Sequence, residues 1–320
     1  MKRIILFDWI RVIAIWGIVL SHFLMTFMST SLIAGCLATS INAIFFSMSA
    51  LLLGKAWCDK GRMAYQASFL VKRFSRLAVP LWLFLVAFFV VTYCLGDRFS
   101  LKSVLLNFCF LSWFAKIPGI GHLWFVTMIS LLYIVFFLIS RLWKRLNNNL
   151  WLFVGHSVIC GFFYICLTFF GLPAYMAFIL WYSVLLFVYA DKILRWCDTA
   201  KVGYPFVLFA IISSLIVLSL IDLDGPLKPI LYNAVGVLSL FVLLIAFRNA
   251  QVLPKWVESN SAMSYELYLV HHPFVIGPYS LGALFSNQYV FFLVYVCLSA
   301  VLALLLSWSS NRIRKMNSSL

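Results

Sequence analysis

The chain has 320 residues, of which 65% are hydrophobic and only 10% are charged, and its formal net charge is +15. A soluble domain is nearer half apolar and a quarter charged. This composition excludes an ordinary soluble protein, because such a chain would lack the polar surface needed in water, whereas lipid requires the apolar excess. The sequence therefore predicts an all-α integral membrane protein.

Apolar stretches of the length that crosses a bilayer follow one another along the whole chain. No loop between them is long enough for a soluble domain, so residues 1–320 are predicted to form a single transmembrane domain. The boundary between the first two stretches is the least distinct, because the link between them carries no charge. About ten spans are expected, at residues 5–28, 32–54, 77–96, 120–140, 150–170, 174–190, 204–221, 229–247, 262–280 and 288–309.

The basic residues test this count, because cytoplasmic loops carry an excess of Lys and Arg. With the N-terminus inside, 19 of the 24 basic residues fall in inside segments and 4 in outside segments, and Arg11 lies within the first span. A wrong number of spans would remove this asymmetry between the inside and outside segments. We therefore expect both termini in the cytoplasm. The same placement accounts for the net positive charge through topology and anionic lipid, which argues against nucleic-acid binding.

Cysteine spacing and glycine patterns predict no bound metal or cofactor. The eight cysteines show no paired spacing and most lie within apolar stretches, where cysteine behaves as a small hydrophobe. No phosphate-binding glycine loop, dinucleotide fingerprint or helical zinc motif occurs.

The first predicted span contains two ionisable residues, Arg11 and His22, and such residues within a membrane are candidate functional groups. Eleven positions are close to three helical turns, so both side chains project from nearly the same face, roughly 16 Å apart along the axis. This spacing suits a long ligand with an anionic part near the cytoplasm and a reactive end deep in the membrane. A desolvated histidine is held neutral, and neutral imidazole can act as a general base. The alternative is a histidine that packs between helices while Arg11 reaches the interface.

Five sequence blocks, in order along the chain, resemble those of the acyltransferase-3 family. The first, Asp8-x-x-Arg11 followed by Ser21-His22, resembles the family's Arg-x10-His signature. The others are Phe45-Phe46-Ser47-Met48-Ser49-Ala50, Lys72-Arg73-Phe74-Ser75-Arg76-Leu77-Ala78-Val79-Pro80, Gly121-His122-Leu123-Trp124-Phe125 and Ser264-Tyr265-Glu266-Leu267-Tyr268-Leu269-Val270-His271. The resemblance covers nearly the whole chain and is to the short form without a fused secreted domain.

This resemblance implies that His22 is the catalytic base and Arg11 its essential companion. It also favours an acyl-CoA-binding role for Arg73 and Arg76, whose guanidinium groups match phosphate oxygens. The alternative for these two residues is a positive-inside anchor to lipid headgroups. His272 need not share the role of its neighbour, and His156 is expected to be a core residue. Residues expected to bind the acceptor or support the base are Ser49, His122, Trp124, Tyr268 and His271.

The predicted function is that of an O-acyltransferase of the bacterial inner membrane. Acyl-CoA, most simply acetyl-CoA, would be the co-substrate, and the resemblance implies a carbohydrate or glycolipid acceptor of the envelope. The main alternative is a transporter or polysaccharide exporter that uses the same intramembrane polar residues to line a path. A non-catalytic membrane subunit would leave Arg11 and His22 without a purpose.

Overall fold

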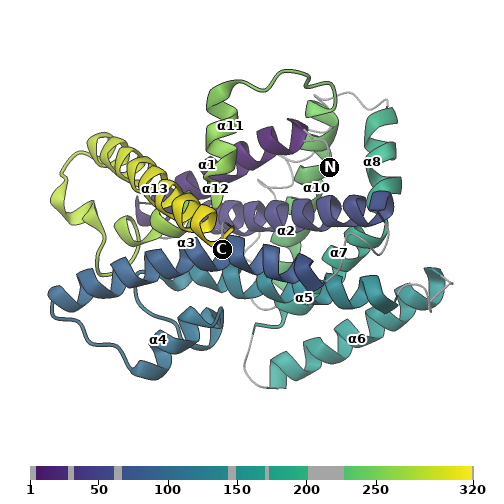
Figure 1. The fold of residues 1–320 in the computed structure, drawn as a ribbon, viewed down its shortest axis with the longest axis horizontal. Helices are drawn as coiled ribbons and strands as arrows, with labels where there is room; N and C mark the ends of the chain where they lie inside the picture. Colours follow the sequence, from purple (N-terminus) through teal and green to yellow (C-terminus); the bar gives the residue numbers. More distant parts are fainter. Residues whose placement is uncertain are drawn as a thin grey trace.

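The computed structural model describes residues 5–27, 32–60, 67–142, 149–169, 173–200 and 227–318. Every secondary-structure element in these ranges is a helix, which confirms the predicted all-α class. The long helices are α1 (Ile5–Phe27), α2 (Leu32–Lys60), α3 (Ala67–Cys94), α5 (Trp124–Leu142), α6 (Asn149–Phe169), α10 (Leu227–Phe247) and α13 (Gln288–Ser318). The shorter ones are α4 (Leu101–Phe108), α7 (Tyr175–Val188), α8 (Ala190–Thr199), α11 (Lys255–Ala262) and α12 (Ser264–Val270), with single 3₁₀ turns between them (Figure 1).

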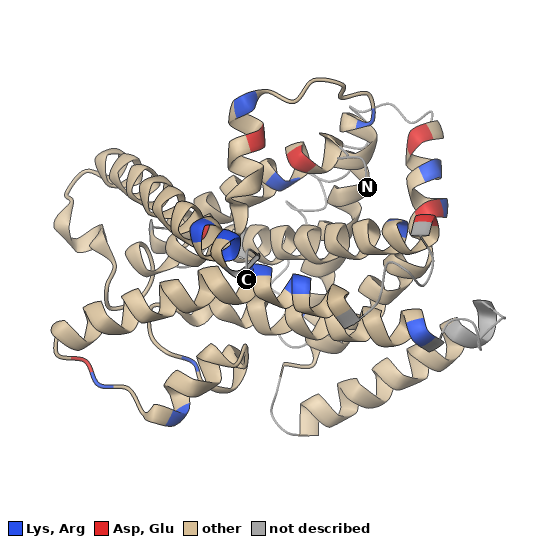
Figure 2. Ribbon diagram, in the orientation of Figure 1, with Lys and Arg blue, Asp and Glu red and all other residues tan. Residues whose placement is uncertain are grey.

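Six of the described helices are long and apolar enough to cross a membrane, and there are seven if the pair α7 and α8, which bends by 73°, forms one span. Along the described helices, charged residues lie mostly near the ends (Figure 2). A multi-pass membrane protein is therefore confirmed. Of the ten predicted spans, that at 204–221 lies outside the described residues, and the one at 150–170 corresponds to α6, whose apolar part is shorter than the six long spans.

The stretch predicted at 262–280 differs from the expectation of one continuous span. The chain is broken there into the end of α11, the short helix α12 and a 3₁₀ turn at His272–Phe274. Pro273 lies within that turn, and proline lacks the N–H that an α-helix would need at this point. The break places the two histidines at the end of α12 in the interior of the bundle, where both are buried.

Helix α2 is the centre of the bundle and packs against α1, α5, α7, α8 and α10. Its contacts with α10 and α7 are close, because a Cβ added at Gly236 would lie 2.1 Å from the Ser40 carbonyl oxygen and one added at Gly54 would lie 2.1 Å from the Phe187 carbonyl oxygen. The Ser40 hydroxyl also donates to the Tyr232 carbonyl at 2.8 Å. Small residues and hydroxyl groups of this kind let helices approach closely in lipid.

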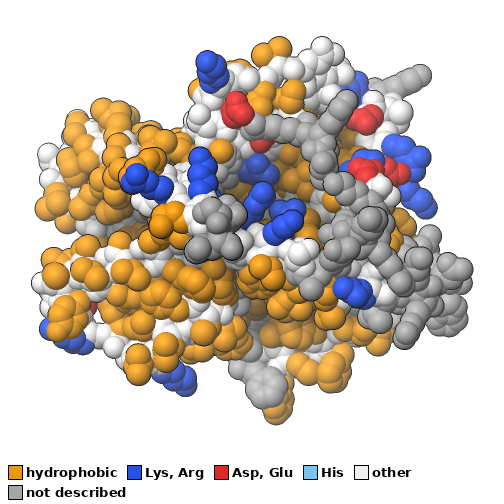
Figure 3. All heavy atoms as spheres, in the orientation of Figure 1, with side chains coloured by type: hydrophobic (Ala, Val, Ile, Leu, Met, Phe, Trp, Pro, Cys, Tyr) orange, Lys and Arg blue, Asp and Glu red, His pale blue; other side chains and the backbone are white. Residues whose placement is uncertain are grey.

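The outer faces of α3 and α13 are strongly apolar, with exposed residues such as Val86, Val90, Leu293 and Leu304. Figure 3 shows this apolar surface on either side of a group of basic side chains at the centre of the view. A belt of apolar side chains is what lipid tails require.

Candidate active site

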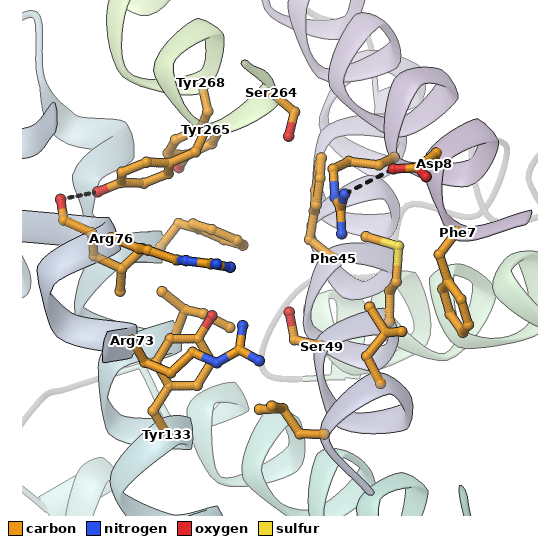
Figure 4. A pocket seen from close by; sticks show the side chains of 17 residues that line it. Phe7, Asp8, Phe45, Ser49, Arg73, Arg76, Tyr133, Ser264, Tyr265 and Tyr268 are labelled. Atoms are coloured by element: carbon orange, nitrogen blue, oxygen red, sulfur yellow. Dashed lines mark hydrogen bonds and ion pairs between the residues drawn. The ribbon is translucent and has the colours of Figure 1, made fainter. Parts of the chain in front are cut away.

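A cavity of about 440 Å³ lies among α1, α2, α3, α5 and α12. Its lining residues lie in the first halves of α1, α3 and α5, mostly in the second half of α2, and in α12. Three arginines line it together with apolar and aromatic side chains (Figure 4). The polar lining residues are Asp8, Arg11, Ser49, Arg73, Arg76, Tyr133, Ser264, Tyr265 and Tyr268.

Arg11 is held at the cavity wall by residues from two helices. Its Nη1 lies 3.4 Å from Oδ1 of Asp8, one turn earlier in α1, and 2.9 Å from the hydroxyl of Ser261 in α11. The Ser261 hydroxyl in turn donates to Asp8. A carboxylate and a hydroxyl that bind one nitrogen restrict the orientation of the guanidinium plane. The sequence pattern contains Asp8 but gives no signal for Ser261, which is 250 residues away from Arg11.

Arg73 and Arg76 enter the cavity from α3, and in Figure 4 both guanidinium groups extend into it. Asp8 is the one acidic residue among the described lining residues, and it lies beside Arg11. Neither Arg73 nor Arg76 has an ion-pair partner within the part of the chain that the structure describes. The cavity therefore has an excess of positive charge and suits an anionic ligand with several acceptor oxygens.

Four buried histidines, His22, His122, His271 and His272, form a cluster in the bundle. They come from the last turns of α1, the turn before α5, and the end of α12. The ring of His22 lies 5.0 Å from those of both His271 and His272, and the rings of His122 and His272 stack at 4.4 Å.

A chain of hydrogen bonds fixes the proton positions on two of these rings. His271 Nδ1 lies 3.1 Å from the Leu267 carbonyl, which can accept but cannot donate, so Nδ1 carries a proton. In the neutral ring, His271 Nε2 is then an acceptor, and it lies 2.8 Å from Nδ1 of His22. His22 therefore donates from Nδ1 and has its lone pair on Nε2, for which the described residues provide no hydrogen-bond partner. This is the arrangement that a general base requires.

The other two rings are also oriented by main-chain carbonyls. His272 Nδ1 donates to Gly119 at 2.9 Å, and His122 Nε2 donates to Leu269 at 3.2 Å. The Nδ1 of His122 is buried without a hydrogen-bond partner among the described residues. Each neutral ring of the cluster donates its single N–H to another group of the protein. The described residues contain no group of three or more side chains arranged to hold a metal ion.

Tyr268 connects the cavity to the histidine cluster. Its ring lines the cavity and lies 5.2 Å from the ring of His122, and its hydroxyl donates to the His122 carbonyl. It packs against Phe125, which also lines the cavity, with ring centroids 4.8 Å apart. Because α1 is continuous from Arg11 to His22, the separation of roughly 16 Å along its axis holds. One helix thus joins a basic cavity to a cluster of imidazoles.

The structure brings most of the predicted site residues into these two groups. The cavity contains Arg11, Arg73, Arg76, Ser49 and Tyr268, and the cluster contains His22, His122 and His271. Trp124 is in neither group, because its ring packs against Trp113, Phe46 and Tyr175. Ser49 faces the arginines (Figure 4), so it lies at the basic end of the site and not beside the histidines.

The sequence prediction missed Ser261, Tyr133 and Tyr265, which also belong to the site, and left His272 without a role. Tyr265 is within the last family block, but a motif does not show which of its aromatic residues face a cavity. The hydroxyl of Tyr265 donates to the Leu77 carbonyl at 3.2 Å, which links α12 to α3. Tyr133 lies outside all five blocks, in an apolar run where nothing distinguishes it from a packing residue.

A bundle of membrane-spanning helices with buried histidines beside a basic cavity defines a membrane protein with an internal reaction or binding site. The family model for the acyltransferase-3 acyltransferase domain matches residues 4–312, nearly the whole chain. The chain therefore belongs to the acyltransferase-3 family and is a membrane acyltransferase. It has no match among curated proteins or among solved structures.

Proposed function

We propose that the protein is an O-acyltransferase in which His22 is the general base. The observation that carries this proposal is the chain of hydrogen bonds from the Leu267 carbonyl through His271, because it leaves the lone pair of His22 on Nε2. Buried neutral imidazole can take a proton from a hydroxyl that is itself hardly acidic. The acyl donor is acyl-CoA, most simply acetyl-CoA, which acts as a co-substrate and not as a bound cofactor.

The reaction follows from this arrangement. Nε2 of His22 removes the proton of the acceptor hydroxyl as its oxygen attacks the thioester carbon. The carbon–sulfur bond then breaks, and the proton on His22 passes to the departing sulfur, so the products are an ester and free CoA. The positive charge that forms on His22 during this step is shared through Nδ1–H with His271, whose Nε2 is 2.8 Å away.

The basic cavity and the histidine cluster match the two ends of the acyl-CoA donor. The phosphates of CoA fit the cavity with Arg73 and Arg76, while the long pantetheine arm extends along α1 toward the histidines. Tyr268 and Phe125 lie where that arm would pass, because both line the cavity and Tyr268 also contacts His122. Arg11 then holds the donor and does not exchange a proton with His22, given their separation of roughly 16 Å.

The orientation that fits this scheme has the cavity open to the cytoplasm, where CoA is made. The excess of basic residues in the inside segments supports it. Both termini would then be cytoplasmic, with ten spans in a bacterial inner membrane. A reporter fused after Leu320 should give a cytoplasmic signal, and a periplasmic signal would mean an odd number of spans.

The acceptor in this scheme is a hydroxyl of an envelope carbohydrate or glycolipid, so the activity is the O-acetylation of a surface polysaccharide or its precursor. Two imidazole lone pairs, on His22 and His272, suit a ligand that carries several hydroxyl donors. The acceptor can be identified by comparing, by mass, the surface polysaccharide of cells with and without the protein. The expected difference is the loss of acetyl groups.

Transfer of labelled acetyl from acetyl-CoA by the purified protein, in nanodiscs with envelope glycans as acceptors, tests the proposal directly. Wild-type protein should transfer label, and His22→Ala should not. A transporter or exporter would transfer no acetyl group in this assay, yet would move the glycan across a vesicle membrane. That result would replace the proposed function.

A further inference from the structure

Tyr133 of α5 is a buried phenol that lines the cavity. Its exposed fraction is 9%, and its side chain reaches the cavity beside Arg73 (Figure 4). Within the described residues, its hydroxyl has no hydrogen-bond partner. Because Tyr133 lines the cavity, its hydroxyl is available to a ligand that accepts a hydrogen bond there. Such a ligand would supply the partner that the described residues do not.

The surroundings of Tyr133 define the chemistry of that ligand. The Arg73 guanidinium carbon lies 5.9 Å from the centroid of the Tyr133 ring and 5.5 Å from that of Phe69. Two aromatic faces therefore position Arg73 at the cavity wall. Arg76 lines the same cavity from one turn later in α3. The phenol thus lies next to positive charge that the described residues do not neutralise.

A phosphate group fits this combination best. Its terminal oxygens are several strong acceptors that point in different directions, and they can bind two guanidinium groups and a hydroxyl at the same time. Ser49 adds a second hydroxyl from α2, on another wall of the cavity. A carboxylate has two oxygens in one plane and would satisfy fewer of these donors.

We propose that the Tyr133 hydroxyl donates a hydrogen bond to a phosphate of the acyl-CoA donor and completes an anion site with Arg73 and Arg76. This inference rests on the proposed function for the identity of the donor. It assigns Tyr133 to substrate binding and not to the chemical step, since the acyl group reacts at the far histidines.

The substitution Tyr133→Phe in the full-length protein tests the assignment, because it removes one oxygen and preserves the ring under Arg73. Binding of CoA, measured by calorimetry in nanodiscs of zwitterionic lipid, should weaken roughly ten- to a hundredfold, as for a hydrogen bond to a charged group. The KM for acetyl-CoA should rise by a similar factor, while kcat at saturating donor stays unchanged. Thermal unfolding of the variant should resemble that of wild type.

The matched control is Tyr182→Phe, which removes a buried phenol oxygen elsewhere in the bundle. Tyr182 donates to Asn233 at 3.2 Å and lies outside the cavity lining. This control should bind CoA with wild-type affinity. A comparison of CoA with inorganic pyrophosphate then separates the phosphates from the rest of the donor, and Tyr133→Phe should weaken both.

Several outcomes would overturn the inference. If Tyr133→Phe binds CoA as wild type does while Arg76→Ala does not, the phenol has no part in the site, although the proposed function stands. If the substitution leaves CoA binding unchanged and reduces only the affinity for anionic lipid in vesicles, the phosphate at this site is that of a lipid headgroup. If wild-type protein binds no CoA, the proposed function itself fails, and this assignment fails with it.

Discussion

His22 and His271, which are 249 residues apart in the sequence, lie with their rings nearly parallel and with Nδ1 of the first 2.8 Å from Nε2 of the second. The Leu267 carbonyl orients His271, and His271 orients His22. An imidazole of this kind resembles the oriented base of many hydrolases, where a second group holds the ring in the tautomer that leaves the reactive nitrogen free.

His22→Ala should abolish acyl transfer, because a general base contributes about 10²–10⁴-fold to the rate. The substitution removes a polar group from a membrane helix and leaves a good helix former, so insertion and expression should be normal. Transfer of labelled acetyl from acetyl-CoA measures the effect. His156→Ala is the control, since His156 bonds to the Trp181 carbonyl on α7 and lies outside both residue groups. A His22→Ala protein that acylates at the wild-type rate would remove the proposed base.

His271→Ala should reduce kcat less than His22→Ala does, because the base remains but its tautomer and orientation are no longer fixed. The double substitution should be no slower than His22→Ala, since residues that act as a unit are not additive. Rates of the two single variants and the double variant at saturating acetyl-CoA test this. Losses that multiply would show that His271 acts independently of His22.

Part of the site could be predicted from the sequence, because Arg11 and His22 share a face of a continuous helix and the helical repeat fixes their separation. The same holds for Arg73 and Arg76, which are three positions apart in α3. The identity of the partners could not be predicted in this way. Ser261 contacts Arg11, Gly119 contacts His272 and His271 contacts His22 through the tertiary arrangement of α11, α12 and the loop before α5, and no local pattern encodes that arrangement.

The fold, like the site, could be predicted from the sequence only in part. Hydropathy located the long apolar helices α1, α2, α3, α5, α10 and α13 to within several residues at most boundaries. It failed at 262–280, where the mean composition is apolar but the chain breaks between α11 and α12 and again at the 3₁₀ turn that contains Pro273. The short helix α4, between the spans predicted at 77–96 and 120–140, is amphipathic and begins with Ser100 as its N-cap.

Ser261→Ala should raise the KM for acetyl-CoA, because it removes the hydroxyl that donates to Asp8 and accepts from Arg11. A hydrogen bond to a charged group contributes about 1.5–3 kcal/mol, so the expected increase is roughly tenfold or more. Ser261→Thr preserves the hydroxyl and should retain most of the affinity. Ser299→Ala, a buried serine of α13 whose hydroxyl has no partner among the described residues, should leave KM unchanged. Equal effects of the Ser261 and Ser299 substitutions would argue against a clamp on Arg11.

Arg11→Lys separates charge from shape at the same position. Lysine retains the positive charge but has no planar fork, so it cannot bind Asp8, Ser261 and a ligand in the same geometry. We expect Arg11→Ala to inactivate the enzyme and Arg11→Lys to retain partial activity with a raised KM. The measurement is donor saturation of acetyl transfer for both variants. Full activity of Arg11→Lys would mean that Arg11 contributes a point charge and that the clamp is dispensable.

Gly119→Ala should disturb the histidine cluster through the loop that packs against it. Gly119 has a φ of +83°, and an added Cβ would lie 2.8 Å from the Tyr279 ring, while its carbonyl accepts the hydrogen bond of His272. A positive φ costs an alanine about 1–2 kcal/mol, so stability should fall. Gly96→Ala is the matched control, because Gly96 has a φ of +98° with nothing within 4 Å of an added Cβ. Thermal unfolding should detect a loss in both variants, whereas acetyl transfer should decline mainly in Gly119→Ala, where the clash with Tyr279 displaces the carbonyl that orients His272. Equal activity of the two variants, measured well below their unfolding temperatures, would show that this loop does not position the cluster.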